Sequence, residues 1–400
     1  MIIGLIGKAN VGKSTFFNAA TDLAAPVANY PFTTIEPNVG VAYARTKCVC
    51  REFGVQDNPV HSVCIDGNRF IPVKLVDVAG LVPGAHAGKG LGNRFLDDAR
   101  QADALIHIID ASGSTDNNGR PVPAGSGDPI FDIRFIEEEF DLWLESIIGR
   151  DWGKTAREAE SQGQKLEQLL AKRLSGLAIN EQTIINAMQA SGLASKKPVA
   201  WAQSDILQFC KALRTRAKPF VIAANKADLP TADNNIDKMK VDGLEPVPCA
   251  SEAEALLRKA SKKGILHYLP GDSSFAVKPE AVLSTPQLKA LDIVKTFMQK
   301  YSSTGVQEAI NIACFKLLRM VAVYPVEDEF KLTDKKGNIL PDVWLLPEGS
   351  TVKDLAEAIH SDLAKGFLYA VDARTKQRIA ATHQLKNGDV IKITSATSRG

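Results

Sequence analysis

The chain lacks the long apolar runs, the charge imbalance and the cysteine density that mark several classes of protein. No stretch of its 400 residues approaches the ~18 consecutive apolar residues of a membrane helix. Its 48 basic and 46 acidic side chains leave a net charge of +2, so any nucleic-acid contact must come from a local patch. Six cysteines in a chain this long indicate reduced thiols without a disulfide framework. We therefore expect a cytoplasmic protein with no membrane partner.

Four residues form a nominal metal set, namely Cys48, Cys50, His61 and Cys64. Their spacing lacks the C-x₂₋₄-C knuckle of common structural zinc sites. Alternation of Cys48 and Cys50 on one face of a strand is the simpler explanation, because thiols are readily buried as small hydrophobes. A metal site stays the minority alternative.

The first residues fit a phosphate-binding loop. Residues 7–14 match G-x-x-x-x-G-K-[ST], follow a strand-like apolar run and precede a helix-compatible segment. Glycines let backbone N–H groups converge on phosphate oxygens, and the helix points the positive end of its dipole at the anion. Lys13 can reach the β- and γ-phosphates, and the Ser14 hydroxyl can ligate Mg²⁺. The predicted phosphate-binding residues of this loop are Asn10, Val11, Gly12, Lys13, Ser14 and Thr15.

A second strand-like run, residues 70–76, ends at Asp77, whose carboxylate is expected beside the phosphate loop as a Mg²⁺ contact. Gly80 then offers an unobstructed backbone N–H to the γ-phosphate. Between the two runs lie Thr33 and Thr34, either of which can reach Mg²⁺ only while the γ-phosphate is present. Ordinary turn chemistry is the alternative explanation for these adjacent hydroxyls.

A third buried run, residues 219–224, delivers Asn225, Lys226 and Asp228 to its carboxyl end, where open α/β sheets bind ligands. Asp228 can accept from two neighbouring N–H groups of guanine, which adenine does not offer. Lys226 is expected to pack its stem over the base and Asn225 to tie this loop to the first one. The backbone N–H of Ala250 is expected to reach the guanine O6. The sequence thus predicts a site for GTP and GDP.

These motifs resemble those of the Obg–YchF group of translation-associated GTPases, in its archaeal and fungal branch. The resemblance covers nearly all of the chain and is most specific over residues 30–38 and 77–93. Residues from 321 to about 395 are similar to a TGS domain, which the family uses as an RNA or ribosome contact. The implied fold is α/β: a P-loop NTPase (Ras-like) G domain with a helical insertion, plus a C-terminal β-grasp (ubiquitin-like) TGS domain.

The resemblance also implies roles for single residues. It implies Mg²⁺ ligation by Ser14 and Thr34, with Thr34 preferred over Thr33 because the bacterial branch keeps a threonine only at the second position. That branch replaces the guanine-reading tetrad and prefers ATP. This chain retains Asp228, which favours GTP.

The catalytic group stays unassigned. Leu81 stands where Ras-like enzymes place the glutamine that orients water, and an aliphatic side chain cannot hold water, so unaided hydrolysis should be slow. Asn10 either satisfies the loop backbone or, as in related GTPases, accompanies a K⁺ ion between the phosphates. His86 is the other candidate, if its loop closes on the γ-phosphate. Arg94 can stabilise transition-state charge, yet such arginines more often form solvent-facing ion pairs.

Length and periodicity predict several domains. The expected division is a GTP-binding domain over residues 1–127 and 217–275, a helical insertion over 128–216, a helical connector over 276–320 and the TGS domain over 321–396. In the last of these, basic side chains outnumber acidic ones, which makes an RNA-contacting face plausible without sequence reading. The basic residues are Lys331, Lys335, Lys336, Lys353, Lys365, Arg374, Lys376, Arg378, Lys386, Lys392 and Arg399.

The sequence therefore predicts a Mg²⁺-dependent GTPase that cleaves GTP to GDP and phosphate, acts as a nucleotide switch and docks on the ribosome or on structured RNA. One alternative is a nucleotide-gated ribosome- or RNA-binding module with little intrinsic hydrolysis. The other is an ATPase like the bacterial relatives.

Overall fold

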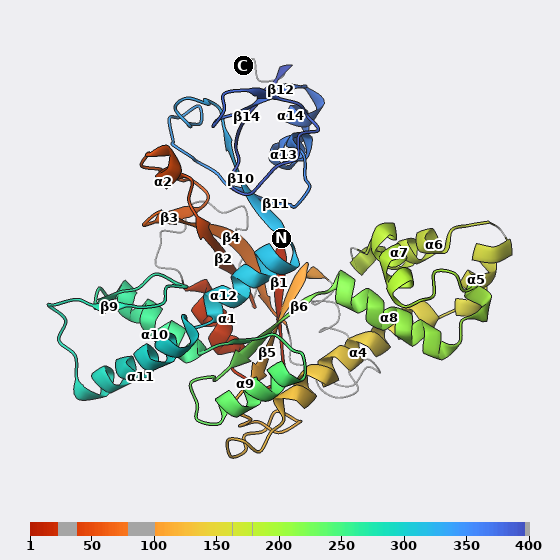
Figure 1. The fold of residues 1–400 in the computed structure, drawn as a ribbon, viewed down its shortest axis with the longest axis horizontal. Helices are drawn as coiled ribbons and strands as arrows, with labels where there is room; N and C mark the ends of the chain where they lie inside the picture. The colour runs from red at the N-terminus through yellow and green to blue at the C-terminus, as the bar shows by residue number, and fades with distance from the viewer. Residues whose placement is uncertain (23–37, 79–100, 162, 178, 397–400) are drawn as a thin grey trace. The chain divides into compact units, whose positions relative to one another are not determined.

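The computed structural model describes residues 1–22, 38–78, 101–161, 163–177 and 179–396 (Figure 1). The chain forms two compact units. Unit 1 comprises the described residues of Met1–Asp22, Asn38–Gly40 and Lys74–Ala309. Unit 2 comprises those of Val41–Val73 and Ile310–Gly400. No helix in these described segments combines the length and apolar character that crossing a bilayer requires.

The seven-stranded sheet is built mainly on parallel strands. β1, β5, β6, β7 and parts of β2 and β4 belong to unit 1, whereas β3 and the rest of β2 and β4 belong to unit 2. The strands of the sheet run in the order β2-β4-β1-β5-β6-β7, with β3 paired to β4. The neighbours β4–β1, β1–β5, β5–β6 and β6–β7 are all parallel. Every residue of β5 is buried, because a parallel sheet covered on both faces takes continuous apolar runs. The bounds are β1 Ile2–Ile6, β2 Val39–Lys47, β3 Val63–Ile65, β4 Asn68–Asp77, β5 Ala104–Asp110, β6 Phe220–Asn225 and β7 Pro246–Pro248.

Helices and short strands complete unit 1. α1 and α10 pack against each other, and α10, α9 and α11 share one apolar core with the ends of β5 and β6. The two-residue strands β8 and β9 pair antiparallel. The bounds are α1 Lys13–Thr21, α9 Ala232–Val241, α10 Ser251–Lys262, β8 Leu266–His267, β9 Ala276–Val277, α11 Thr285–Tyr301 and α12 Val306–Asn311, whose last two residues belong to unit 2.

The expected helical region between β5 and β6 is present. Its long helix α4 serves two cores: Ile136 and Phe140 pack with the sheet residues, whereas Leu144 and Ile148 pack with the other insertion helices. Figure 1 shows α5, α6 and α7 gathered in one lobe with α8, and α7 packs against α8. The bounds are α4 Pro129–Gly149, α5 Trp152–Ser161, α6 Leu166–Arg173, α7 Glu181–Ala190 and α8 Gln203–Ala217.

Unit 2 contains a β-grasp. Its five-stranded sheet has the order β11-β10-β14-β12-β13, with β10 and β14 parallel and the other pairs antiparallel. Helix α13 begins at a capping box of Thr351 and Asp354 and buries Val352 and Leu355 against the sheet. The bounds are β10 Met320–Val326, β11 Trp344–Pro347, α13 Val352–Ile359, α14 Ser361–Lys365, β12 Phe367–Asp372, β13 Arg378–Ile379 and β14 Val390–Ser395, after a π-helical turn Ile312–Leu317.

Residues 41–73, which the sequence analysis assigned to the GTP-binding domain, fall in unit 2 with the β-grasp. Polar side chains make the connection: Arg69 is fully buried and donates to the Leu340 carbonyl, while His61 pairs with Asp342 at 2.5 Å. The expected alternation of two cysteines along a strand is wrong. Cys48 follows the end of β2, and Cys50 begins the short helix α2 Cys50–Phe53, because the chain turns out of the sheet between them.

Candidate nucleotide site

The loop between β1 and α1 has the conformation that its glycines permit. Gly7, Asn10 and Gly12 have positive φ angles of 151°, 63° and 92°. A Cβ at Gly12 would lie 2.3 Å from the Asn225 amide nitrogen, and one at Gly7 would lie 2.4 Å from the Ile108 carbonyl oxygen. Only glycine fits at these two positions, so the loop lies closely against the carboxyl ends of β5 and β6.

Three side chains expected at the phosphates and Mg²⁺ meet at the start of α1. The Lys13 ammonium lies 2.5 Å from Asp77 Oδ1, and the Ser14 hydroxyl lies 3.4 Å from Asp77 Oδ2. Asp77 is positioned because β4 runs parallel beside β1, with Leu5 opposite Asp77. A hydroxyl and a carboxylate beside one ammonium suit Mg²⁺ when phosphate oxygens and water complete its ligands. The donor set therefore fits this ion.

Asn225 joins three loops. Its amide nitrogen donates to the Val11 carbonyl at 2.9 Å, and its amide oxygen accepts from the Ser251 N–H at 3.1 Å and the Ser251 hydroxyl at 2.8 Å. The side chain is 3% exposed, so these hydrogen bonds are shielded from water. The phosphate loop, the loop after β6 and the start of α10 are thus held in one arrangement.

Lys226 is held by a residue that lies outside the sequence motifs. Its ammonium donates to Asp110 Oδ2 at 2.9 Å and to the Ser114 hydroxyl at 3.1 Å. Burial by itself raises the pKa of Asp110, but hydrogen bonds from Ser112, Lys226 and Ser114 outweigh it and lower that pKa below its usual value. The available signal in the sequence was a single acidic residue at the end of a mainly apolar strand, since β5 ends at Asp110.

The two remaining guanine candidates differ in availability. The Asp228 side chain is exposed, while partial desolvation and the charge of Glu252 raise its pKa. The Ala250 N–H already donates to the Thr304 carbonyl at 2.9 Å. Asp228 therefore presents an open acceptor, whereas the Ala250 donor is engaged in this structure.

The loop that contains Thr115, Asp116 and Gly119 contacts the phosphate loop, and no sequence motif predicted this contact. The Lys8 ammonium forms a buried ion pair with Asp132 at 2.7 Å and donates to the carbonyls of Thr115 and Asp116. Desolvation raises the pKa of Asp132 to about 6, although the Lys8 contact opposes that rise. The Asn10 amide donates to the Gly119 carbonyl at 2.9 Å, which is the kind of backbone contact that the first explanation of Asn10 requires.

Several predicted positions cannot be placed. Thr33, Thr34, Gly80, Leu81, His86 and Arg94 lie outside the described residues.

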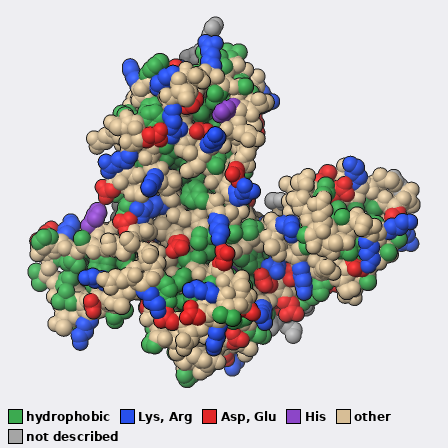
Figure 2. Space-filling view, viewed as in Figure 1, with side chains coloured by type: hydrophobic (Ala, Val, Ile, Leu, Met, Phe, Trp, Pro, Cys, Tyr) green, Lys and Arg blue, Asp and Glu red, His purple; other side chains and the backbone are tan. Residues whose placement is uncertain are grey.

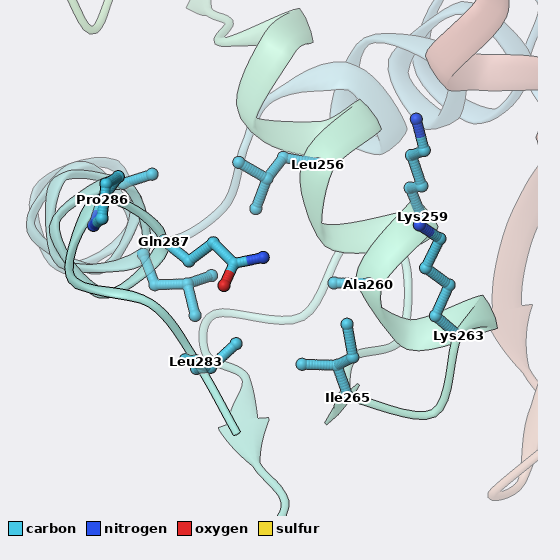
Figure 3. Close-up of a pocket in the computed structure, with 10 residues that line it drawn as sticks. Leu256, Lys259, Ala260, Lys263, Ile265, Leu283, Pro286 and Gln287 are labelled. Atoms are coloured by element: carbon cyan, nitrogen blue, oxygen red, sulfur yellow. The ribbon is translucent and has the colours of Figure 1, made fainter. Parts of the chain in front are cut away.

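A separate cavity of about 330 Å³ lies between α10 and α11 (Figure 3). Leu256, Ala260, Ile265 and Leu283 give it a mainly apolar lining, and Lys259 stands at its side. None of the predicted nucleotide-binding residues lines this cavity. It is therefore distinct from the candidate nucleotide site.

Comparison with known families matches three segments of the chain. Residues 2–124 match a model described as 50S ribosome-binding GTPase, residues 223–328 match the Obg-like GTPase YGR210-like, G4 motif-containing domain, and residues 331–395 match the TGS domain. These matches confirm the expected fold class.

Similar proteins span nearly the whole chain. The uncharacterized GTP-binding protein MJ1332 of Methanocaldococcus jannaschii is 48% identical over 397 residues, 99% of each chain. The uncharacterized GTP-binding protein C428.15 of Schizosaccharomyces pombe is 34% identical over 374 residues, 90% of each chain. The crystal structure of a GTP binding protein from Pyrococcus horikoshii OT3 is 40% identical with a TM-score of 0.78, covering 99% of this chain and 100% of that one.

Proposed function

This chain belongs to the Obg-like GTPases of the YGR210/MJ1332 type, and we propose that it binds GTP with Mg²⁺ and slowly hydrolyses it to GDP and phosphate. The observation that carries the proposal is the link from Asn225 to Val11, because it joins the loop expected at the base to the loop expected at the phosphates. One purine nucleotide can then contact both loops.

In this proposal the phosphates lie along the N–H groups of residues 10–15 at the start of α1. Lys13 would contact the β- and γ-phosphates, and the Asp77 carboxylate and the Ser14 hydroxyl would hold Mg²⁺. Gly80 and Thr34 complete the γ-phosphate sensor, as the resemblance implies. Mg²⁺ supplies charge neutralisation at these oxygens when bound.

The base lies against Lys226 and Asp228. Asp110 fixes the Lys226 ammonium, which leaves the lysine stem as an apolar cover for the base plane. The exposed Asp228 carboxylate then accepts two N–H groups of guanine. A contact from the Ala250 N–H to the guanine O6 requires the Thr304 carbonyl to give way.

Turnover is proposed to be slow because Leu81 cannot orient water. His86, or a K⁺ ion held near Asn10, is the candidate for completing the catalytic site. We therefore expect the bound nucleotide, and not the rate of hydrolysis, to be the main output of the protein.

We propose that the TGS domain docks on the ribosome or on structured RNA. The model that matches residues 2–124 is described as a 50S ribosome-binding GTPase, and this description also favours a ribosomal partner. On the face shown in Figure 2 basic and acidic side chains are intermingled. Arg374 and Lys392 are paired with Glu52 and Glu329. The better candidates for phosphate contacts are the exposed lysines Lys335, Lys336, Lys353 and Lys386.

Phosphate release from GTP, measured with and without ribosomes and with K⁺ replaced by Na⁺, tests the enzymatic proposal. We expect slow release that ribosomes or K⁺ accelerate. Absence of release under every condition would leave the nucleotide-gated binding module.

The proposed recognition of guanine is tested by Asp228→Asn. This change removes a charged acceptor worth about 1.5–3 kcal/mol and should weaken GTP binding about 10–100-fold. The matched control Asp237→Asn changes an exposed acid on α9, and equal effects of the two variants would contradict the assignment.

A further inference from the structure

Three thiols and one carboxylate meet in unit 2, in a cluster that the nucleotide site does not use. Their candidate ligand atoms all lie within 4.8 Å of one another. Cys50 Sγ lies 3.8 Å from Cys64 Sγ, and Cys48 Sγ lies 3.1 Å from Asp57 Oδ2. Cys48 directly follows β2, Cys50 begins α2, Asp57 lies in the following loop and Cys64 lies in β3. Residues separated in sequence therefore converge on one point.

The spacing of this cluster suits a tetrahedral metal ion. With Zn–S bonds of ~2.3 Å, neighbouring sulfurs of a tetrahedron lie ~3.8 Å apart. The Cys50–Cys64 distance has this value, and the remaining donors need only small movements to complete the set. Zn²⁺ takes both the soft thiolate sulfur of cysteine and the hard carboxylate oxygen of aspartate as ligands. We propose that Cys48, Cys50, Asp57 and Cys64 bind one structural Zn²⁺ ion.

The surroundings supply what such an ion needs. Cys48 and Cys50 are buried and the Asp57 side chain is 7% exposed, so little water competes for the ion. Cys48 also borders a cavity of about 460 Å³ in the same unit. His61, the fourth member of the set suggested by the sequence, is paired with Asp342. Asp57 supplies the fourth ligand in place of His61.

Arg69 compensates charge and orients two ligands. It is fully buried, lies 2.7 Å from Asp57 Oδ2 and donates twice to Cys48 Sγ at 3.4 Å. Four anionic ligands exceed the charge of Zn²⁺ by two, and the guanidinium offsets one of these charges. Such outer hydrogen bonds are typical of metal sites because they fix ligand orientation. Within the described residues the Arg69 guanidinium donates to Cys48, Ser62, Asp57 and Leu340 and not to Cys50 or Cys64, so it does not explain the approach of Cys50 to Cys64.

The site also has a structural consequence. Arg69 donates to the Leu340 carbonyl at 3.2 Å and lies over the Tyr324 ring at 5.3 Å, both in the C-terminal part of unit 2. The ion thus fixes α2, β3 and the loop between them, and Arg69 extends that order to the β-grasp. Binding releases the thiol protons, so affinity falls as pH is lowered.

Elemental analysis of the full-length protein, purified with reductant and without chelator, tests the proposal. We expect close to one zinc per chain. Loss of a residue that only hydrogen-bonds a metal ligand lowers metal affinity about 10–100-fold. Cys64→Ala and Asp57→Asn each change a proposed ligand itself, so each should lower the zinc affinity by at least this factor. The matched control is Cys314→Ala, which removes a buried thiol of the same unit outside the cluster. The control should keep its zinc.

A second measurement does not depend on how the variants fold. Wild-type protein stripped of metal is titrated with Co²⁺, and the expected spectrum has intense tetrahedral d–d bands and a thiolate-to-metal charge-transfer band. Metal-free protein that takes up neither Co²⁺ nor Zn²⁺ overturns the proposal. A Cys50–Cys64 disulfide, detected by mass spectrometry in freshly purified protein, overturns it as well.

Discussion

Replacing Asn225 with alanine tests the link between the two nucleotide loops most directly. The change removes three hydrogen bonds of 2.8–3.1 Å and leaves the Val11 carbonyl and the Ser251 N–H without their partner. A buried backbone group that loses its partner costs about 1–3 kcal/mol. The Ser251 hydroxyl can rotate to another acceptor and adds less. We therefore expect Asn225→Ala to lower the free energy of unfolding of unit 1 by about 2–6 kcal/mol.

The matched control is Asn235→Ala in α9. Asn235 is half-buried and makes a single hydrogen bond, from its amide nitrogen to the Ala111 carbonyl at 2.9 Å. Its loss should cost about 1 kcal/mol. Because 1 kcal/mol corresponds to about 2–4 °C in a domain of this size, thermal unfolding should separate the two variants by several degrees.

Added nucleotide sharpens the test. A ligand at 100 times its Kd stabilises the folded protein by about 2.7 kcal/mol, and Asn225→Ala should lose much of this gain because its phosphate loop is no longer fixed. Asn235→Ala should keep the gain. Equal melting temperatures and equal responses to GTP in the two variants would refute the role given to Asn225.

Three other outcomes are expected. Asp77→Asn should weaken Mg²⁺-dependent GTP binding about 10–100-fold, and calorimetry that finds unchanged affinity would contradict the Mg²⁺ assignment. Because the folded protein holds the Asp132 proton more tightly than the unfolded chain, the stability from this carboxyl is full below about pH 4 and falls as the pH rises to about 6. Urea unfolding across this range should show a flatter profile for Asp132→Asn, and an unaltered profile would argue against the raised pKa. Glu52→Gln weakens the pair with Arg374, in which Glu52 is 51% exposed, and should cost less than about 1 kcal/mol in thermal unfolding. A larger loss would mean that this pair organises unit 2.

The parts of the fold that depend on local pattern could be predicted. The apolar run before Gly7 and the one before Asn225 read as buried parallel strands, and the structure has β1 and β6 at these places. The loops at their carboxyl ends carry the motifs because parallel strands end at one edge of the sheet. The helix over Ile136 and Phe140 was equally visible, since its apolar residues recur every three or four positions.

Partners distant in sequence could not be predicted. The contacts of Lys8 with Asp132 and of Lys226 with Asp110 each span more than 100 residues, and no local spacing reports them. The placement of the cysteines was predicted wrongly for a related reason. Cys48 and Cys50 looked like strand neighbours, but the chain leaves the sheet between them, and Asp57 carries no recognisable ligand spacing.

The ion pair of Lys13 with Asp77 gives the proposed site a simple logic. Each charge is largely shielded, with exposed fractions of 14% and 12%, so neither can lose its partner without a cost in desolvation. In the proposed complex phosphate oxygens would be the partner of Lys13, and Mg²⁺ would be the partner of Asp77. GTP alone would leave Asp77 without a counter-charge, and Mg²⁺ alone would crowd two cations against it. Binding of one should therefore favour binding of the other, so the coupling arises from the pair itself and needs no movement of the sheet.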